Sequence, residues 1–249
     1  MKIFYGLLAG LILFSPFLAH STTYQVTSIL DDGSAGTWRW AIQQANNTTF
    51  NQLDTIQFNA PATITMITFP ESINDSLVVF GEGWTIDGDD TWQGPKINSW
   101  CKIFDLIIFN CRWTGQGAGM VVSAHTELIN CTVTNCTASS YGGGIRHSGS
   151  SDLILTDCVF NQNVSNSTNA LGGGALFSSS SGKLTLDGCT FIGNSAPQGN
   201  AIQVSMTDIY FAGETSFGVN QDIHRFQGTE EIYLEPTFCI PPSYRFSMN

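Results

Sequence analysis

Short apolar segments bounded by turn residues recur along most of this chain. Residues 153–156 and 183–186 are two examples, and each is followed by Asp or by Asp-Gly. Segments of this length, separated by turn residues, are typical of β-strands rather than of helices. We therefore predict an all-β fold built from many short strands.

These segments belong to a repeat. Each copy opens with a glycine-rich run that ends in an apolar residue, and it closes with a Phe-x-x-Asn motif. The distance from the apolar residue to the Cys or Thr that precedes the Phe is the same in three copies. The repeat-motif residues are Gly142, Gly143, Gly144, Ile145, Phe160 and Asn163, then Gly173, Gly174, Ala175, Leu176, Phe191 and Asn194, then Phe217 and Asn220.

The length of the repeat favours a β-solenoid. Helical repeats span roughly 33–47 residues because most contain two helices, and these copies are shorter. We predict that each copy forms one coil of a single-stranded parallel β-helix, with equivalent residues stacked about 4.8 Å apart. The variable stretch between copies, residues 164–171, is predicted to be a loop.

Stacked coils would align like residues into ladders. The predicted apolar ladders are Leu128, Leu155 and Leu186; Ile145, Leu176 and Ile202; and Phe160, Phe191 and Phe217. Asn163, Asn194 and Asn220 are predicted to hydrogen-bond along the axis where each coil turns. For these motif residues a structural role outweighs a role in adhesion.

Two weaker copies precede these three. In the first, residues 131–136, Cys136 stands where the Asn of the motif is expected. In the second, residues 111–116 stand at the same place, followed by the glycine-containing residues 117–120. The solenoid is therefore predicted to extend upstream of the clear repeats.

The seven cysteines do not have the spacing of a metal site. Cys131 and Cys136 have no second matching pair, and the histidines do not cluster with them. Stacked side chains point the same way, which separates their Cβ atoms beyond the distance that a disulfide prefers. Cys131, Cys158 and Cys189 are therefore predicted to be buried thiols, and no metal or cofactor is expected.

The N-terminus has the layout of a secretory signal peptide. Lys2 is followed by the apolar residues 3–14, and Ala19 and Ser21 are small residues suited to cleavage. Export implies that the protein acts at the outer membrane surface or outside the cell, with no membrane-spanning segment after cleavage. The predicted division is a signal peptide (1–21), an N-terminal cap (22–60), a parallel β-helix (61–235) and a C-terminal tail (236–249).

The charge composition narrows the partners. Charged residues make up 12% of the chain, and the formal net charge is −11. Nucleic-acid binding depends on basic residues that neutralise phosphates, and docking on anionic lipid needs the same charges. No nucleic-acid partner is therefore expected, whereas a host-cell surface protein or glycan is compatible with a polar surface of low charge.

The paired motifs resemble those of the chlamydial polymorphic outer membrane proteins. The resemblance rests on Gly-Gly-Ala-apolar at residues 173–176 with Phe-x-x-Asn at residues 191–194, and on the matching motifs one copy earlier. It covers about residues 111–220. It implies a right-handed parallel β-helix, surface display and adhesion to host cells.

A second resemblance concerns the N-terminal cap. Residues 36–46, 54–58 and 85–88 look like the capping helix, the following strand and the entry into the first coils found in many bacterial surface β-helices. Solenoids need a cap over their open ends. A short helix is therefore expected, with Trp40, Ile42 and Ala45 over the first coil.

Two groups of residues offer a catalytic alternative, because some polysaccharide-active enzymes also use β-helices. Asp87, Asp89 and Asp90 could supply the paired carboxylates of a glycoside hydrolase. Their sequence favours a turn instead, and no basic residue is expected beside them. Arg146 and His147, with His125, offer a histidine side chain that titrates near neutrality and could act as a base. A loop histidine beside an arginine is usually only a surface residue. No catalytic residue is therefore predicted. The expected function is a non-catalytic adhesin or host-interaction module, and a secreted lyase or glycoside hydrolase remains the alternative.

Overall fold

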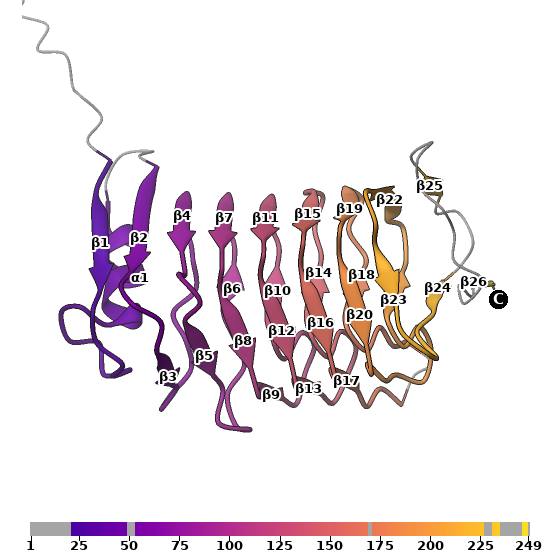
Figure 1. Cartoon of the computed structure of the whole chain (residues 1–249), viewed down its shortest axis with the longest axis horizontal. Helices are drawn as coiled ribbons and strands as arrows, with labels where there is room; N and C mark the ends of the chain where they lie inside the picture. The colour runs from indigo at the N-terminus through magenta and orange to yellow at the C-terminus, as the bar shows by residue number, and fades with distance from the viewer. Residues whose placement is uncertain (1–20, 49–52, 169–170, 227–230, 235–245, 249) are drawn as a thin grey trace, which may run out of the picture.

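The computed structural model describes residues 21–48, 53–168, 171–226 and 231–234, and the backbone of residues 246–248. The chain winds into a solenoid in which strands of successive coils lie side by side along the long axis (Figure 1). Every strand pairing is parallel. The predicted parallel β-helix is therefore confirmed.

Four parallel sheets build the solenoid, and we name them A to D; sheet D has strands in only three of the described coils. Sheet A contains β1 (Thr23–Val26), β2 (Asp54–Phe58), β4 (Leu77–Phe80), β7 (Cys101–Phe104), β11 (Thr126–Ile129), β15 (Leu153–Thr156), β19 (Lys183–Asp187), β22 (Asp208–Ala212) and β25 (Ile232–Leu234). Sheet B contains β3 (Thr63–Thr65), β5 (Thr85–Asp87), β8 (Ile107–Phe109), β12 (Thr132–Thr134), β16 (Val159–Asn161), β20 (Thr190–Ile192) and β23 (Ser216–Phe217).

The other two sheets complete each coil. Sheet C contains β6 (Lys96–Ile97), β10 (Met120–Val122), β14 (Ile145–His147), β18 (Leu176–Ser178), β21 (Ile202–Val204), β24 (Ile223–Arg225) and β26 (Phe246–Met248). Sheet D contains β9 (Arg112–Trp113), β13 (Thr137–Ala138) and β17 (Val164–Ser165). Where sheet D is present, one full coil runs through sheets A, B, D and C in turn.

The interior contains the predicted ladders. Leu128 pairs with Leu155 and Leu155 with Leu186, and all three are fully buried. Ile145, Leu176 and Ile202 are aligned in the same way in sheet C. The rings of Phe160 and Phe191 stack 5.0 Å apart, and those of Phe191 and Phe217 stack 4.8 Å apart. Burial of these side chains is the main source of stability in such a fold.

The amide ladder differs from the prediction in its third member. Asn163 donates from Nδ2 to Oδ1 of Asn194 at 3.0 Å, as expected. Asn194 then donates to Oε1 of Gln221 at 2.9 Å, whereas Asn220 is exposed. The third copy has one extra residue after Phe217, so Asn220 takes the left-handed position (φ 61) that Gly193 occupies one coil earlier (φ 63). The prediction for Asn220 was wrong.

The glycine-rich runs allow close backbone stacking. A Cβ on Gly144 would lie 2.5 Å from the carbonyl oxygen of Ala175 in the next coil, and one on Gly174 would lie 2.3 Å from that of Asn200. Real Cβ atoms do not approach a carbonyl so closely, so only glycine fits there. These motif glycines therefore have a structural role that the geometry explains.

Two details of the predicted repeat were wrong. Cys111 aligns with Cys136, because Arg112 pairs with Thr137 in sheet D, so residues 111–116 stand one strand later in the coil than expected. Residues 164–171 are not a loop throughout. Val164 and Ser165 form β17 and pair with β13, because their alternation continues the small sheet D.

The cysteines that the structure describes are buried free thiols, as predicted for Cys131, Cys158 and Cys189. Burial raises the pKa of the Cys101 thiol, which keeps it protonated. Cys239 lies outside the described residues. Within those residues no group of His, Cys, Asp or Glu has the arrangement of a metal site.

The one helix among the described residues, α1 (Trp38–Asn46), closes the N-terminal end beside β1 and β2 (Figure 1). It begins after Thr37, whose hydroxyl accepts from the backbone N–H of Trp40. Ile42 and Ala45 are buried against the first coil, as predicted for a cap. Trp40 is only partly buried and packs edge-on against Tyr24 at 5.9 Å.

The predicted terminal segments are mostly not covered. Residues 1–20 of the predicted signal peptide and nearly all of the predicted tail (236–249) lie outside the described residues. Over the part of the chain that the structure describes, no helix has the length and apolarity needed to cross a membrane.

Candidate functional site

The predicted pair Arg146 and His147 is divided between two faces of sheet C. Both lie in β14, where successive side chains point to opposite sides of the sheet. His147 is fully buried in the solenoid, which corrects the expectation that it is a surface residue. His125 lies elsewhere, 3.6 Å from a carboxylate oxygen of Glu127. The three residues therefore do not form one site.

The interior environment of His147 makes it a structural residue. Its ring nitrogens hydrogen-bond to the hydroxyl of Ser178 and to the carbonyl oxygen of Ser151, both at 2.8 Å. Ser178 in turn bonds to Thr207 at 2.8 Å. Burial lowers the pKa of His147 to about 4. The imidazole is therefore neutral near pH 7 and has no access to a substrate.

Arg146 points outward and is held in one orientation. Its Nε donates to Gln116 at 2.8 Å, one terminal nitrogen donates to Ser179 at 2.7 Å, and the other donates to the His147 carbonyl oxygen. The guanidinium carbon lies 5.6 Å from the centre of the Tyr141 ring and 4.9 Å from that of Phe177. Burial lowers the pKa of Arg146, yet arginine stays charged at any physiological pH.

A polar groove runs along the outer face of sheet C beside Arg146. We call it the Lys96–Arg146 groove, because Lys96, Val121 and Arg146 are aligned across β6, β10 and β14. Its volume is about 400 Å³, and Gln93, Trp113 and Gln116 are among its lining residues. No Asp or Glu lines the part of it that the structure describes. The groove therefore combines two cations, amide groups and an indole ring.

Three aromatic side chains from separate segments of the chain pack together on one side of the groove. Trp113 packs edge-on against Phe69 at 4.8 Å, and Phe69 packs against Trp92 at 6.0 Å. The Lys96 ammonium lies 5.7 Å from the centre of the Phe69 ring. A cation near an aromatic face is stabilised by the quadrupole of the ring. The rings therefore fix the position of Lys96 without neutralising it.

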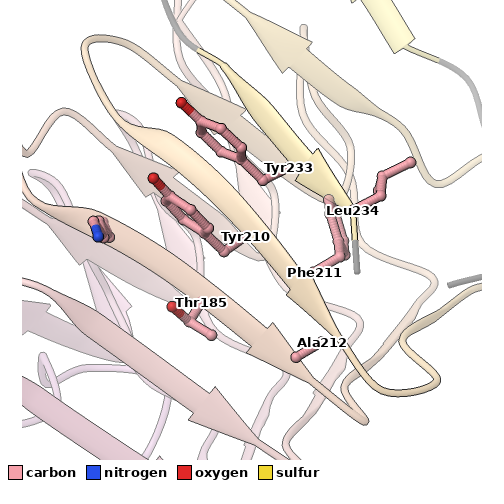
Figure 2. A pocket seen from close by; sticks show the side chains of 7 residues that line it. Thr185, Tyr210, Phe211, Ala212, Tyr233 and Leu234 are labelled. Atoms are coloured by element: carbon pink, nitrogen blue, oxygen red, sulfur yellow. The ribbon is translucent and has the colours of Figure 1, made fainter. Parts of the chain in front are cut away.

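A second hollow lies on the outer face of sheet A near its C-terminal end. Tyr210 and Tyr233 point to the same side of adjacent strands β22 and β25 (Figure 2), with ring centres 4.4 Å apart and planes only 7° from parallel. The Lys183 ammonium lies 5.0 Å from the Tyr210 ring centre. The hollow has a volume of about 460 Å³, and it offers flat aromatic surface to a ligand.

The acidic run after β5 forms a turn. Asp89 and Asp90 adopt left-handed conformations (φ 53 and 50), and Oδ1 of Asp87 accepts from the backbone N–H of Asp89 at 2.8 Å. Asp90 is paired with Arg112 at 2.7 Å, so the expectation that no basic residue lies beside this run was wrong. Arg112 reaches Asp90 because sheet D places it in the next coil.

Two other carboxylates, those of Glu82 and Asp105, line a third hollow at the corner between sheets A and B. Both residues occupy the left-handed position of this corner, with φ of 51 and 53. Glu82 accepts a hydrogen bond from Gln57, and Asp105 accepts one from Asn130 in the next coil. The bond from Asn130 to Asp105 joins stacked turn residues, and that from Gln57 joins a residue of β2 to the corner, so both carboxylates have structural partners.

The fold and the groove define a class of protein: a parallel β-helix with ligand-sized hollows on its outer faces. The model of the right-handed β-helix region matches residues 46–216, more than half of the chain, and the chain therefore belongs to that family. No curated protein and no solved structure matches the chain. Domains of this family occur in adhesins and in polysaccharide-active enzymes alike, so membership alone favours neither function.

Sequence reasoning identified Arg146 but missed the other residues of the groove. Lys96 and Trp113 precede the clear repeats, where the motif is too degenerate to give the register. The alignment of residues 117–120 with residues 142–145 was available, and carrying it one coil further upstream would have placed Lys96 beside Val121 and Arg146.

Proposed function

We propose that this chain is an exported β-helix that acts as an adhesin or host-interaction module, at the outer membrane surface or outside the cell, by binding rather than by catalysis. One observation carries the proposal. Two hollows on its outer faces combine aromatic rings, cations and hydrogen-bonding groups, and no Asp or Glu of the described chain lines either one. Such surfaces suit contact with a protein or glycan.

The residues that could have supported acid–base chemistry have other partners. His147 is buried and bonded to Ser178, and Asp90 is paired with Arg112. A general acid or base must lie within hydrogen-bond reach of the group whose proton it transfers. These contacts therefore support binding over turnover. The resemblance of the repeats to polymorphic outer membrane proteins agrees with this proposal and remains a prediction.

The direct test is binding of the purified chain without residues 1–21 to host cells, with heat-unfolded protein as the control. Saturable binding of the folded protein, together with no turnover across a broad panel of neutral and acidic glycans, is the expected result. Failure to saturate on any host cell would contradict adhesion. Release of oligosaccharides from any glycan in the panel would contradict the non-catalytic part of the proposal.

A further inference from the structure

The two cations of the Lys96–Arg146 groove lack the carboxylate partner that three other cations of the described chain have. Arg39, Lys102 and Arg112 each form an ion pair with a carboxylate. Among the described residues, no carboxylate oxygen lies within 4.0 Å of a side-chain nitrogen of Lys96 or Arg146. The chain has 20 acidic and nine basic residues. Within the described chain Lys183 is also without an ion pair but is the only cation that lines its hollow, so two such cations together distinguish the Lys96–Arg146 groove.

The guanidinium of Arg146 is arranged to receive an anion. A guanidinium has five N–H donors, and the bonds to Gln116, Ser179 and the His147 carbonyl oxygen use one N–H on each nitrogen. Each terminal nitrogen therefore keeps one further N–H. The rings of Tyr141 and Phe177 hold the group in place. A fixed guanidinium binds an oxyanion with little loss of conformational entropy.

Gln93 holds the backbone on one side of the groove in place. Its side chain is 1% exposed and lines the groove. Nε2 donates to the carbonyl oxygens of Gln116 and Gly117, at 2.9 and 2.8 Å, which fixes the orientation of the amide. Oε1 is buried and accepts no hydrogen bond within the described chain. Because Oε1 is closed off from the surface, Gln93 supports the groove from beneath and does not itself contact a ligand.

We propose that the Lys96–Arg146 groove binds an acidic glycan, a saccharide whose sugar units have carboxylate or sulfate groups. The anionic group pairs with Arg146 and Lys96, sugar hydroxyls meet the amide of Gln116, and the apolar face of a sugar ring lies on the indole of Trp113. An acidic peptide would match the cations but has no sugar ring to lie on Trp113 and fewer hydroxyls to meet Gln116. This inference rests on the proposed binding function and specifies one ligand for it.

The test is calorimetric titration of the chain without residues 1–21 with four probes. These are an oligogalacturonate (carboxylated), a heparin-derived oligosaccharide (sulfated), a neutral malto-oligosaccharide and poly-glutamate. At least one of the two acidic saccharides is expected to bind more tightly than the neutral one and than poly-glutamate. The arm that binds identifies the anionic group as carboxylate or sulfate.

Three variants locate the binding. Lys96→Gln should weaken it about fivefold and Arg146→Gln about tenfold or more, since the Arg146 contact is bidentate. Lys102→Gln removes the same charge from the outer face of sheet A and should leave affinity unchanged. Because Arg146 also bonds to its neighbours, its variant is interpreted only if its unfolding midpoint stays close to that of the native chain. If that midpoint changes, the Lys96→Gln variant decides whether the groove is the binding site, because it breaks no hydrogen bond of the described chain.

Equal affinity for neutral and acidic saccharides, tighter binding of poly-glutamate, or native affinity in Lys96→Gln would each overturn the inference. The proposed function is judged separately. If the chain binds host cells saturably and the Lys96→Gln variant binds them equally well, the acidic-glycan site is wrong and the adhesin proposal stands. If the native chain binds neither cells nor any of the four probes, both are wrong.

Discussion

The inner and outer faces of sheet C treat polar groups in opposite ways. On the inner face, His147, Ser178 and Thr207 form a buried chain in which each member is hydrogen-bonded to the next. On the outer face, Arg146 and Lys96 have no anionic partner among the described residues. Buried polar groups must be satisfied within the fold, whereas charges at a surface can remain free for a ligand. Substitutions on the inner face therefore test stability, and substitutions on the outer face test binding.

The outer face itself is divided along the solenoid axis. Toward the C-terminal end, Phe177 and Gln203 point outward from sheet C but are buried, and Gln203 accepts from the backbone N–H of Gly172. Lys96 and Val121, aligned with them in earlier coils, remain partly exposed. The chain between β17 and β18 is longer than that between β13 and β14, and Gly172 within it bonds to Gln203 of the next coil. This contact accounts for part of the burial of the outer face at that end.

The largest expected effect on stability comes from truncating a large side chain in the interior. Phe191 is fully buried between Phe160 and Phe217, so Phe191→Ala should lower the free energy of unfolding by about 4 kcal/mol. Its neighbour Ile192 points outward and is 48% exposed, so Ile192→Ala should change it by less than about 0.5 kcal/mol. Urea unfolding of both variants measures the contrast. Similar losses in the two would contradict the register of sheet B.

The next effect is acid destabilisation through His147. Its pKa is about 4 in the folded chain, against 6.5 as the ordinary value. Between these values the unfolded chain binds the extra proton, so stability is complete above pH 6.5 and falls as the pH drops toward 4. The full loss is about 3 kcal/mol, since each pKa unit corresponds to about 1.4 kcal/mol. Urea unfolding at a series of pH values measures it.

Two histidine variants separate this effect from that of other titrating groups. His147→Gln removes the buried imidazole, so the part of the pH dependence between 4 and 6.5 should shrink even if the variant is less stable throughout. His125→Gln changes a side chain that is 34% exposed and serves as the matched histidine comparison. An unchanged slope in His147→Gln would mean that the buried imidazole is not the titrating group.

A smaller effect distinguishes Asn194 from Asn220. Asn194 accepts from the backbone N–H of Asn163 and donates to Phe160 and Gln221, so Asn194→Ala leaves several buried groups unpaired. We expect a loss of about 2 kcal/mol. Asn220 is exposed at φ 61, which glycine adopts freely, so Asn220→Gly should stay within about 0.5 kcal/mol of the native stability. Thermal unfolding compares them, and an equal loss would restore the original assignment of Asn220.

The sequence was sufficient for the ladders because stacking repeats one environment coil after coil. Leu155 and Phe191 could be placed from spacing alone, since the distance along the chain from the leucine ladder to the phenylalanine ladder is the same in successive coils. The errors at Asn220 and Cys111 both come from local shifts of the register. A single inserted residue, or a motif lost in the first coils, shifts the register locally without changing the strand that follows. Periodicity therefore predicted the core better than the turns.

The candidate site was less predictable than the fold. Lys96 and Arg146 are aligned two coils apart, so their proximity depends on the register of coils that lack the clear motif. Sequence spacing also did not place Arg146 and His147 on opposite faces, because the bounds of β14 were needed for that. Whether the groove was open could not be inferred either. That depends on which side chains and connecting residues pack over the outer face, and the spacing of the repeat does not give these.

The smallest expected effect on stability belongs to Lys96, and it completes the contrast between the two faces. Its ammonium has no ion pair among the described residues and contacts only the Phe69 ring, so Lys96→Gln should change the free energy of unfolding by less than about 0.5 kcal/mol. Urea unfolding beside Lys102→Gln measures it. A clear gain in stability would mean that Lys96 is strained by its surroundings, which is the expected signature of a charge kept for a ligand. A loss of more than about 1 kcal/mol would instead show that Lys96 supports the fold.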